Sequence, residues 1–325
     1  IRGHARDYDE WAAHGATGWE WQNVLPYFKR SEGNVRGADA YHGADGPLTV
    51  SDLRYVNPLS EVFVEAGVQA GIPRNDDFNG AMLEGVGLYQ VTQRDGARCS
   101  AAVAYLHPVR DRKNLVVRTD AMVTRITFDK GRTNGVTAVV RGQAFHFEAT
   151  REVLLCGGAI NSPHLLMLSG IGPARALQRH GIAVVHDAPS VGENLQDHLD
   201  ICTLEHSTQP ITYDRLSDVK VAFDYFLRGH QGAGSSNIAE GGGFVRSSLA
   251  PDERPDIQLH FLPAMLDDHG RHRLRGDGYT VHACFLRPRS RGRIALATGR
   301  AGDRPRIEAN YLTDADGFDM RMMVE

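Results

Sequence analysis

The apolar positions of the chain follow two periods, one typical of helices and one typical of strands. Helical spacing predicts two short helices within the first 45 residues and further helices over 57–71, 100–109 and 173–180. Alternation predicts four strands between 115 and 149, separated by turn signals at Lys130-Gly131, Asn134-Gly135 and Arg141-Gly142. The two periods together predict a mixed α/β protein.

A second group of alternating segments follows residue 200 and predicts an antiparallel sheet with one solvated or ligand-facing side. Its strands are expected over 256–263, 279–288 and 292–298. Strands between 46 and 93 can join this sheet, which would make the domains discontinuous in sequence. A glycine-rich segment, 229–244, is expected to form a loop.

The stretch REVLLCGGAINSPHLLMLSGIG, residues 151–172, passes from an apolar run through two glycines into a helical pattern. The run 153–156 predicts a buried, parallel strand because neither of its faces alternates with polar residues. Ser162 and Pro163 predict the N-cap and the first position of a helix that ends at Gly170. Bare backbone of this kind can approach a phosphate or a ring, although a tight connection that binds nothing also fits the pattern.

Composition limits the classes of protein and partner. The chain has 325 residues, enough for two domains, and its 42% hydrophobic and 23% charged residues are ordinary for a globular protein. The formal net charge of −4 gives no electrostatic reason to expect a nucleic-acid partner. No window approaches the ~18 uninterrupted apolar residues of a membrane span.

Cysteine usage bears on the cellular compartment. The four cysteines lie far apart without a CxxC pair, which predicts buried free thiols in a reducing compartment. We therefore expect a cytoplasmic protein, with peripheral association to a membrane left open. The chain begins at Ile1 without methionine and ends in GFDMRMMVE, a pattern like the first turns of a helix, so an upstream targeting signal would not be visible.

Three blocks of the sequence carry a family resemblance: IRGHARDYDEWA, CGGAINSPHLLMLSGIGP and VGENLQDH. They resemble the glucose–methanol–choline (GMC) family of FAD-dependent oxidoreductases. DIQLHFLPAMLDDHGR and LRPRSRGRIALAT are most similar to alcohol dehydrogenases of its choline-dehydrogenase-like branch. The resemblance implies a doubly wound FAD-binding domain formed by 1–45 and 94–198. It also implies a substrate-binding domain with an antiparallel sheet, formed by 46–93 and 199–325.

The resemblance also implies residues that contact the cofactor. Gly157 and Gly158 would end a strand close to FAD, and Val123 in DAMVTRI would meet the adenine through its backbone. From its pattern alone, Val123 is more typical of a strand core. The family's GxGxxG phosphate loop is expected before residue 1 and its catalytic histidine beyond Glu325, because no stretch of this chain matches either.

Four polar residues are candidates for the substrate site. His260 and His282 would line one surface for polar contact or proton relay if their strands pair, although partly exposed sheet residues also fit. Asn237 and Glu240 could hydrogen-bond a substrate or belong to a flexible loop. Choline-specific members of the family tend to have a histidine where this chain has Ile238, which disfavours a choline substrate.

Two short stretches place Asp and His at spacings that metal ligands also use. QDHLD (196–200) and DDHGRH (267–272) are interpreted as solvated turns, since neither supplies a closed set of three or four ligands, and no metal site is predicted. No GxSxG motif supports a serine hydrolase.

The resemblance implies oxidation of a primary alcohol to an aldehyde by hydride transfer to FAD, while a base removes the hydroxyl proton. The electrons would pass to a quinone-type acceptor or to oxygen. Within the same class the alternative is choline dehydrogenase. From a different class, the alternative is a non-catalytic flavin-binding or structural remnant.

Overall fold

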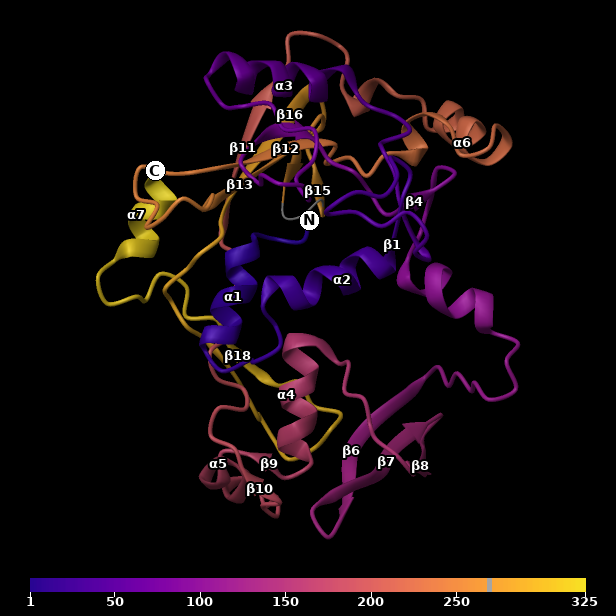
Figure 1. Cartoon of the computed structure of the whole chain (residues 1–325), viewed down its shortest axis with the longest axis vertical. Helices are drawn as coiled ribbons and strands as arrows, with labels where there is room; N and C mark the ends of the chain where they lie inside the picture. Colours follow the sequence, from indigo (N-terminus) through magenta and orange to yellow (C-terminus); the bar gives the residue numbers. More distant parts are fainter. Residues whose placement is uncertain (268–270) are drawn as a thin grey trace. The chain divides into compact units, whose positions relative to one another are not determined.

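The computed structural model describes residues 1–267 and 271–325, which form two compact units (Figure 1). Unit 1 consists of residues 1–115 and 200–287 with residue 325, and unit 2 consists of residues 116–199 and 288–324. The two units are defined by contacts between residues. The predicted FAD-binding and substrate-binding domains are defined by the ligands they bind, so the contacts do not test that division and it remains a prediction.

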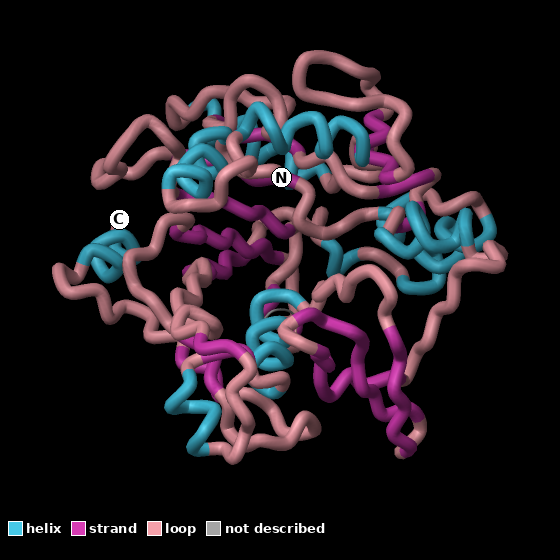
Figure 2. The backbone as a smooth tube through the Cα atoms, turned by 60° about the horizontal axis from the view of Figure 1, so that its bottom comes forward, coloured by secondary structure: helices cyan, strands magenta, loops and turns pink. Residues whose placement is uncertain are grey.

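The centre of unit 1 is a five-stranded antiparallel sheet, whose strands are drawn in magenta in Figure 2. Its order is β11 (Asp200–His206), β16 (Gly278–Phe285), β13 (Ile257–Leu262), β12 (Gly241–Val245) and β3 (Gly85–Leu88). The predicted sheet is therefore confirmed for two of its three strands, and an early strand joins it as expected. The third predicted strand lies elsewhere: β17 (Arg293–Ala295) pairs with β18 (Arg306–Glu308) in unit 2.

The helices of unit 1 follow the apolar spacing. They are α1 (Ala5–Ala13), α2 (Trp21–Ser31), α3 (Pro58–Gln69) and α6 (Asp218–Leu227). Asn57 caps α3 by accepting a hydrogen bond from the Leu59 backbone at 3.0 Å, and a proline occupies the first turn. The Phe63 ring of α3 stacks on Phe261 of the sheet with ring centres 4.8 Å apart.

Several short elements complete unit 1. The predicted helix over 100–109 forms as a π-helical turn, Ala102–Leu106, followed by a 3-10 turn, His107–Val109. Two more 3-10 turns span Tyr213–Arg215 and Gly232–Ser235. The short strands are β1 (Glu32–Asn34), β2 (Leu48–Val50), β4 (Gln93–Arg94), β5 (Ala97–Arg98), β14 (Leu266–Asp267) and β15 (His272–Arg273).

Unit 2 contains a three-stranded antiparallel meander of β6 (Ala121–Asp129), β7 (Arg132–Val140) and β8 (Gln143–Glu148). Both residues of the turns Lys130-Gly131 and Arg141-Gly142 have positive φ, as tight hairpins require. Asn134-Gly135 is not a turn, because it lies inside β7, where a Cβ on Gly135 would come within 2.3 Å of the Phe147 carbonyl oxygen. The predicted strand over 114–119 does not form.

The rest of unit 2 packs around a small apolar core. Its elements are α4 (Gly158–Leu168), β9 (Ile171–Gly172), α5 (Ala174–Arg179), β10 (His186–Asp187), β17, β18 and α7 (Phe318–Val324). The core residues are Met167, Leu168, Leu177, Ile182, Ile294 and Leu296. In the described part of the chain, none of the helices has the length and apolar character needed to cross a bilayer.

Candidate functional site

The segment before α4 differs from its prediction. Residues 153–156 belong to no strand or sheet, and 76% of the Leu154 surface is exposed. The predicted buried strand is therefore wrong for this structure, because no described strand pairs with the run. The helix begins at Gly158 with Gly157 as its N-cap, so Pro163 lies inside α4 rather than at its start.

The end of α4 agrees with its prediction. Gly170 follows the last helical turn with φ of +90°, and its backbone N–H donates to the Met167 carbonyl oxygen at 3.0 Å. This left-handed conformation is the usual way in which a glycine stops a helix.

A pocket of about 620 Å³ in unit 2 brings two of the three predicted cofactor residues together. Val123 lines it from β6, and Gly157 lines it from the start of α4. Gly158 lies next to the lining with φ of +79°, a conformation that favours glycine. The remaining lining residues come from β6, β7, the run 153–156, α4 and the loop 301–305.

The pocket wall is mainly apolar, with few polar groups. His164 is buried in it, and burial holds the pKa of this imidazole below its ordinary value, so the ring is neutral at pH 7. At the rim, hydrogen bonds from Thr298 and Arg300 lower the pKa of Asp303. Such a wall suits a flat, largely apolar group, and its volume is typical of a small-molecule site. Sequence reasoning missed the loop 301–305, since nothing in its residues links it to β6.

The close approach of backbone at Gly157 is built into the fold. A Cβ at this position would lie 3.1 Å from the Ser162 backbone nitrogen and 3.2 Å from the Asn161 Cβ. A larger residue at this position would therefore need its neighbours in the first turn of α4 to shift by a few tenths of an ångström.

His260 and His282 lie directly opposite each other on β13 and β16, so their side chains share one face of the sheet of unit 1. The pairing on which their prediction depended is thus observed. Burial lowers the pKa of His260, and the neighbouring His282 lowers it further, while Asp200 has the opposite effect. The Tyr89 ring centre lies 6.1 Å from that of His260. A neutral imidazole of this kind can accept or relay a proton.

Glu240 does not have the role predicted for it. Its side chain is completely buried and accepts hydrogen bonds from four groups, so it has no surface with which to contact a substrate. The donors are the Asn57 backbone N–H at 2.6 Å, the Ser60 hydroxyl at 2.8 Å, the Ser236 hydroxyl at 2.5 Å and the Tyr213 hydroxyl. The carboxylate anchors the glycine-rich loop to the start of α3.

Asn237 is exposed at the edge of a second pocket in unit 1, formed with residues around 90–100. Its amide donates to the Ala239 carbonyl oxygen at 2.9 Å, and the next residue, Ile238, has φ of +68°. A β-branched residue rarely adopts this conformation, so the loop is strained here. The accessible Asn237 remains a candidate for contact with a substrate.

All four cysteines are free, as predicted, but their burial is mixed. Cys99 is buried and Cys284 is half-buried, whereas Cys156 and Cys202 are exposed. The stretch QDHLD is also not simply a turn, because Asp200 is the first residue of β11. Residues 268–270 of DDHGRH lie outside the described residues.

Comparison with known sequences gives consistent matches along the chain. The family model described as GMC oxidoreductase matches residues 1–200. The chain is 46% identical over 337 residues to the alcohol dehydrogenase (acceptor) of Pseudomonas putida, covering 100% of this chain and 59% of that protein. It is 44% identical over 330 residues to the mitochondrial choline dehydrogenase of Homo sapiens, covering 100% and 55%. The chain thus spans little more than half the length of these relatives.

Solved structures of two oxidases have the same fold. Pyridoxine 4-oxidase from Mesorbium loti is 31% identical, with a TM-score of 0.83 over 98% of this chain and 59% of that one. Formate oxidase from Aspergillus oryzae RIB40 is 25% identical, with a TM-score of 0.90 over 100% of this chain and 63% of that one. These matches confirm the predicted mixed fold with an antiparallel sheet.

Proposed function

Because the chain belongs to the GMC oxidoreductase family, we propose that the protein carrying it oxidises a primary alcohol to an aldehyde with FAD as its cofactor. The observation that carries this proposal is the pocket of unit 2, where Val123 and Gly157 line one apolar wall. FAD is the cofactor of this family, and when bound it supplies the acceptor for the hydride that leaves the alcohol carbon.

The residues of this pocket fit part of such a cofactor. Val123 and Gly157 would hold it through their backbone, since the glycine presents no side chain and the valine lies on a strand. The neutral His164 in the wall adds no charge that would have to be buried with the cofactor. We keep the predicted assignment of 1–45 and 94–198 to cofactor binding and of 46–93 and 199–325 to the substrate.

On the substrate side, we propose that the face of the sheet bearing His260 and His282 orients the alcohol. Two paired imidazoles can donate to or accept from a hydroxyl group, and the half-buried His260 keeps part of its ring accessible for such a contact. We propose that the catalytic base is the histidine that the family resemblance places beyond Glu325. A quinone-type compound or oxygen is proposed as the electron acceptor.

Choline dehydrogenase is the second candidate function, supported by the 44% identity to the human enzyme. Ile238 argues against it, since an aliphatic side chain replaces the histidine that the choline-specific pattern has at this place. A third candidate, a non-catalytic flavin-binding or structural remnant, predicts no turnover of either substrate.

Peripheral membrane association is proposed from the exposed surface of α6. Val219, Phe223, Phe226 and Leu227 lie on one side of this helix, and each of them is at least 52% exposed. On the other side, Asp224 forms ion pairs with Lys220 at 3.0 Å and Arg228 at 3.1 Å. An amphipathic helix with an uncovered apolar face and nearby cations suits the surface of a bilayer.

The substrate proposal is tested on the whole polypeptide that carries residues 1–325, purified with its flavin. Anaerobic addition of a primary alkanol should bleach the oxidised flavin and yield the aldehyde, whereas choline should bleach it much more slowly. Faster bleaching by choline would favour choline dehydrogenase. A bound flavin that neither compound reduces would favour the non-catalytic alternative.

A further inference from the structure

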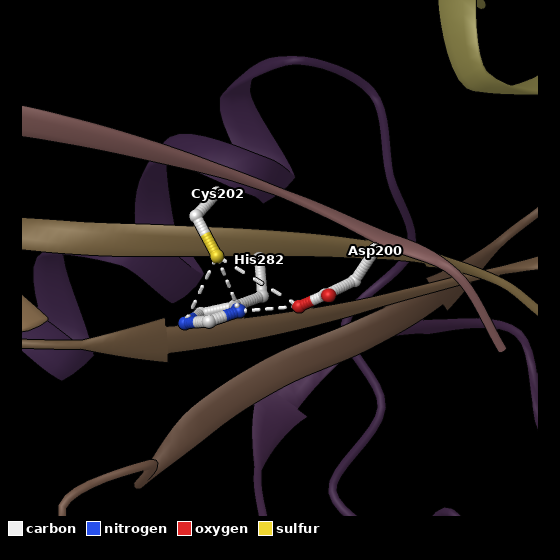
Figure 3. A group of neighbouring side chains, drawn as sticks. All are labelled: Asp200, Cys202 and His282. Carbon is white, nitrogen blue, oxygen red and sulfur yellow. Dashed lines mark hydrogen bonds and ion pairs between the residues drawn. The ribbon is translucent and has the colours of Figure 1, made fainter. Parts of the chain in front are cut away.

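We propose that Asp200, Cys202 and His282 form a binding site for a thiophilic divalent cation, for which Zn²⁺ is the appropriate probe. Figure 3 shows the three side chains converging from neighbouring strands, Asp200 and Cys202 from β11 and His282 from β16. This site goes beyond the proposed oxidation. It shares His282 with the sheet face that is proposed above to orient the alcohol, but its three residues belong to unit 1 and none lines the candidate cofactor pocket, so zinc binding is tested without substrate or flavin.

The strand register brings these side chains together. Asp200 and Cys202 are two residues apart on β11, so both point to the same face of the sheet. His282 pairs directly with Cys202 across the antiparallel ladder, so its side chain lies on that face as well. The cluster therefore follows from backbone pairing and does not depend on a flexible loop.

The ligand atoms form a compact triangle. The His282 Nδ1 lies 2.6 Å from the Asp200 Oδ2 and 2.9 Å from the Cys202 Sγ, and the Sγ and Oδ2 atoms are 3.8 Å apart. One ligand atom from each of the three residues lies within 4.8 Å of the others. In the residues that the structure describes, this is the single group of three such side chains that meets that distance.

The donor set matches the chemistry of zinc. Thiolate sulfur, imidazole nitrogen and carboxylate oxygen are its three protein ligand types. Around a tetrahedral zinc ion, neighbouring ligand atoms lie about 3.4–3.6 Å apart, close to the separation of the sulfur and the carboxylate oxygen. The two shorter edges are hydrogen bonds, and each would have to open by roughly 0.7 Å to hold the ion.

Binding of the ion replaces those hydrogen bonds without any change of oxidation state. The Cys202 thiol releases its proton to solvent and binds as the thiolate. The proton that His282 Nδ1 donates to Asp200 moves through solvent to Nε2, which frees the Nδ1 lone pair for the ion. The Asp200 side chain is 26% exposed and that of His282 16%, while Cys202 is an exposed residue. The site is thus accessible to the ion, and water can occupy the fourth position.

The test is a Zn²⁺ titration of the metal-free whole chain in competition with a chromophoric chelator, repeated with Co²⁺ to record its spectrum. We expect one Zn²⁺ per chain and a thiolate-to-cobalt charge-transfer band. Cys202→Ser should abolish that band and weaken zinc binding by roughly 100-fold or more. Asp200→Asn, nearly the same in shape, should weaken binding by roughly 10-fold or more.

Cys156→Ser is the matched control, because Cys156 is also a free, exposed cysteine but lies in unit 2. It should bind zinc as the wild type does, and far-ultraviolet circular dichroism should show that every variant keeps its fold. The proposal would be overturned by the absence of stoichiometric binding, by a cobalt spectrum without a thiolate band, or by equal affinities of the Cys202→Ser and wild-type chains.

Discussion

Val123 on β6 and Gly157 at the N-cap of α4 line the same pocket of unit 2. The strand supplies an apolar wall, and the glycine supplies backbone without a side chain. The loop 301–305 closes part of the same pocket, together with the buried His164. If this pocket binds a flavin, substitutions of the residues that line it should change flavin binding or stability in ways that can be measured.

Gly157→Val should greatly reduce flavin retention by the whole polypeptide. The branched side chain would crowd both the pocket and the first turn of α4, where a Cβ would already lie 3.1 Å from the Ser162 nitrogen. Crowding of this kind costs about 2 kcal/mol, or roughly 30-fold in affinity. The ratio of flavin absorbance to protein absorbance after gel filtration measures the loss.

Gly302→Ala provides the matched control for this substitution. Gly302 lines the same pocket, but a Cβ there would meet nothing within 4 Å. Its flavin content should stay near that of the wild type. If a folded Gly157→Val variant kept its full flavin content, Gly157 would have no part in binding the cofactor.

Glu240→Ala should destabilise the chain by about 3 kcal/mol, because the substitution leaves four hydrogen-bond donors around a buried site without their acceptor. Urea unfolding followed by circular dichroism measures the change. Glu253→Ala, at an exposed position, should change the stability by less than about 0.5 kcal/mol. Equal effects of the two substitutions would show that Glu240 does not anchor its loop.

His164 predicts a defined dependence of stability on pH. Its pKa is lowered in the folded chain because burial disfavours the imidazolium ion, whereas the unfolded chain takes up a proton near pH 6.5. The stabilisation from this group is therefore full above about pH 6.5 and is lost as the pH falls below it. His164→Leu should flatten the loss of unfolding free energy between about pH 7.5 and about pH 5.

His146→Gln is the control for that experiment, since His146 is exposed on β8. Its pH profile should follow that of the wild type. A His164→Leu profile as steep as the wild-type profile would mean that His164 takes up a proton as readily when folded as when unfolded.

The α6 surface predicts binding to lipid vesicles. Phe226→Ser combined with Leu227→Ser should lower the co-sedimentation of the chain with phosphatidylcholine–phosphatidylglycerol vesicles by roughly tenfold, because both side chains are more than 70% exposed. Met82→Ser, at a position that is 62% exposed outside α6, should leave sedimentation unchanged. Equal binding by all three chains would argue against α6 as the contact.

Local signals predicted much of the fold. The helical spacing of apolar residues over 57–71 predicted α3, and the two hairpin turns of the meander followed from glycines that can take positive φ. The pairing of His260 with His282 was predicted on the condition that two alternating segments were neighbours, and they are.

The predictions that were wrong or missing depend on contacts between segments that are distant in sequence, and a local sequence pattern does not specify such contacts. Residues 153–156 have the composition of a buried strand, but a strand also needs a partner, and no described residues pair with them. In the local sequence, Glu240 looked like an accessible loop residue. It is buried because donors distant in sequence, such as Asn57 and Ser60, surround its carboxylate, and no local pattern shows this. The Asp200–Cys202–His282 cluster depends on the register between β11 and β16, which no single segment specifies.

The most direct test of the central claim is the visible absorption spectrum of the whole polypeptide that carries residues 1–325, recorded after removal of free flavin. We expect the bands of a bound oxidised flavin, together with their loss in the Gly157→Val variant. A folded wild-type protein that shows no flavin bands, even after incubation with excess FAD, would contradict it.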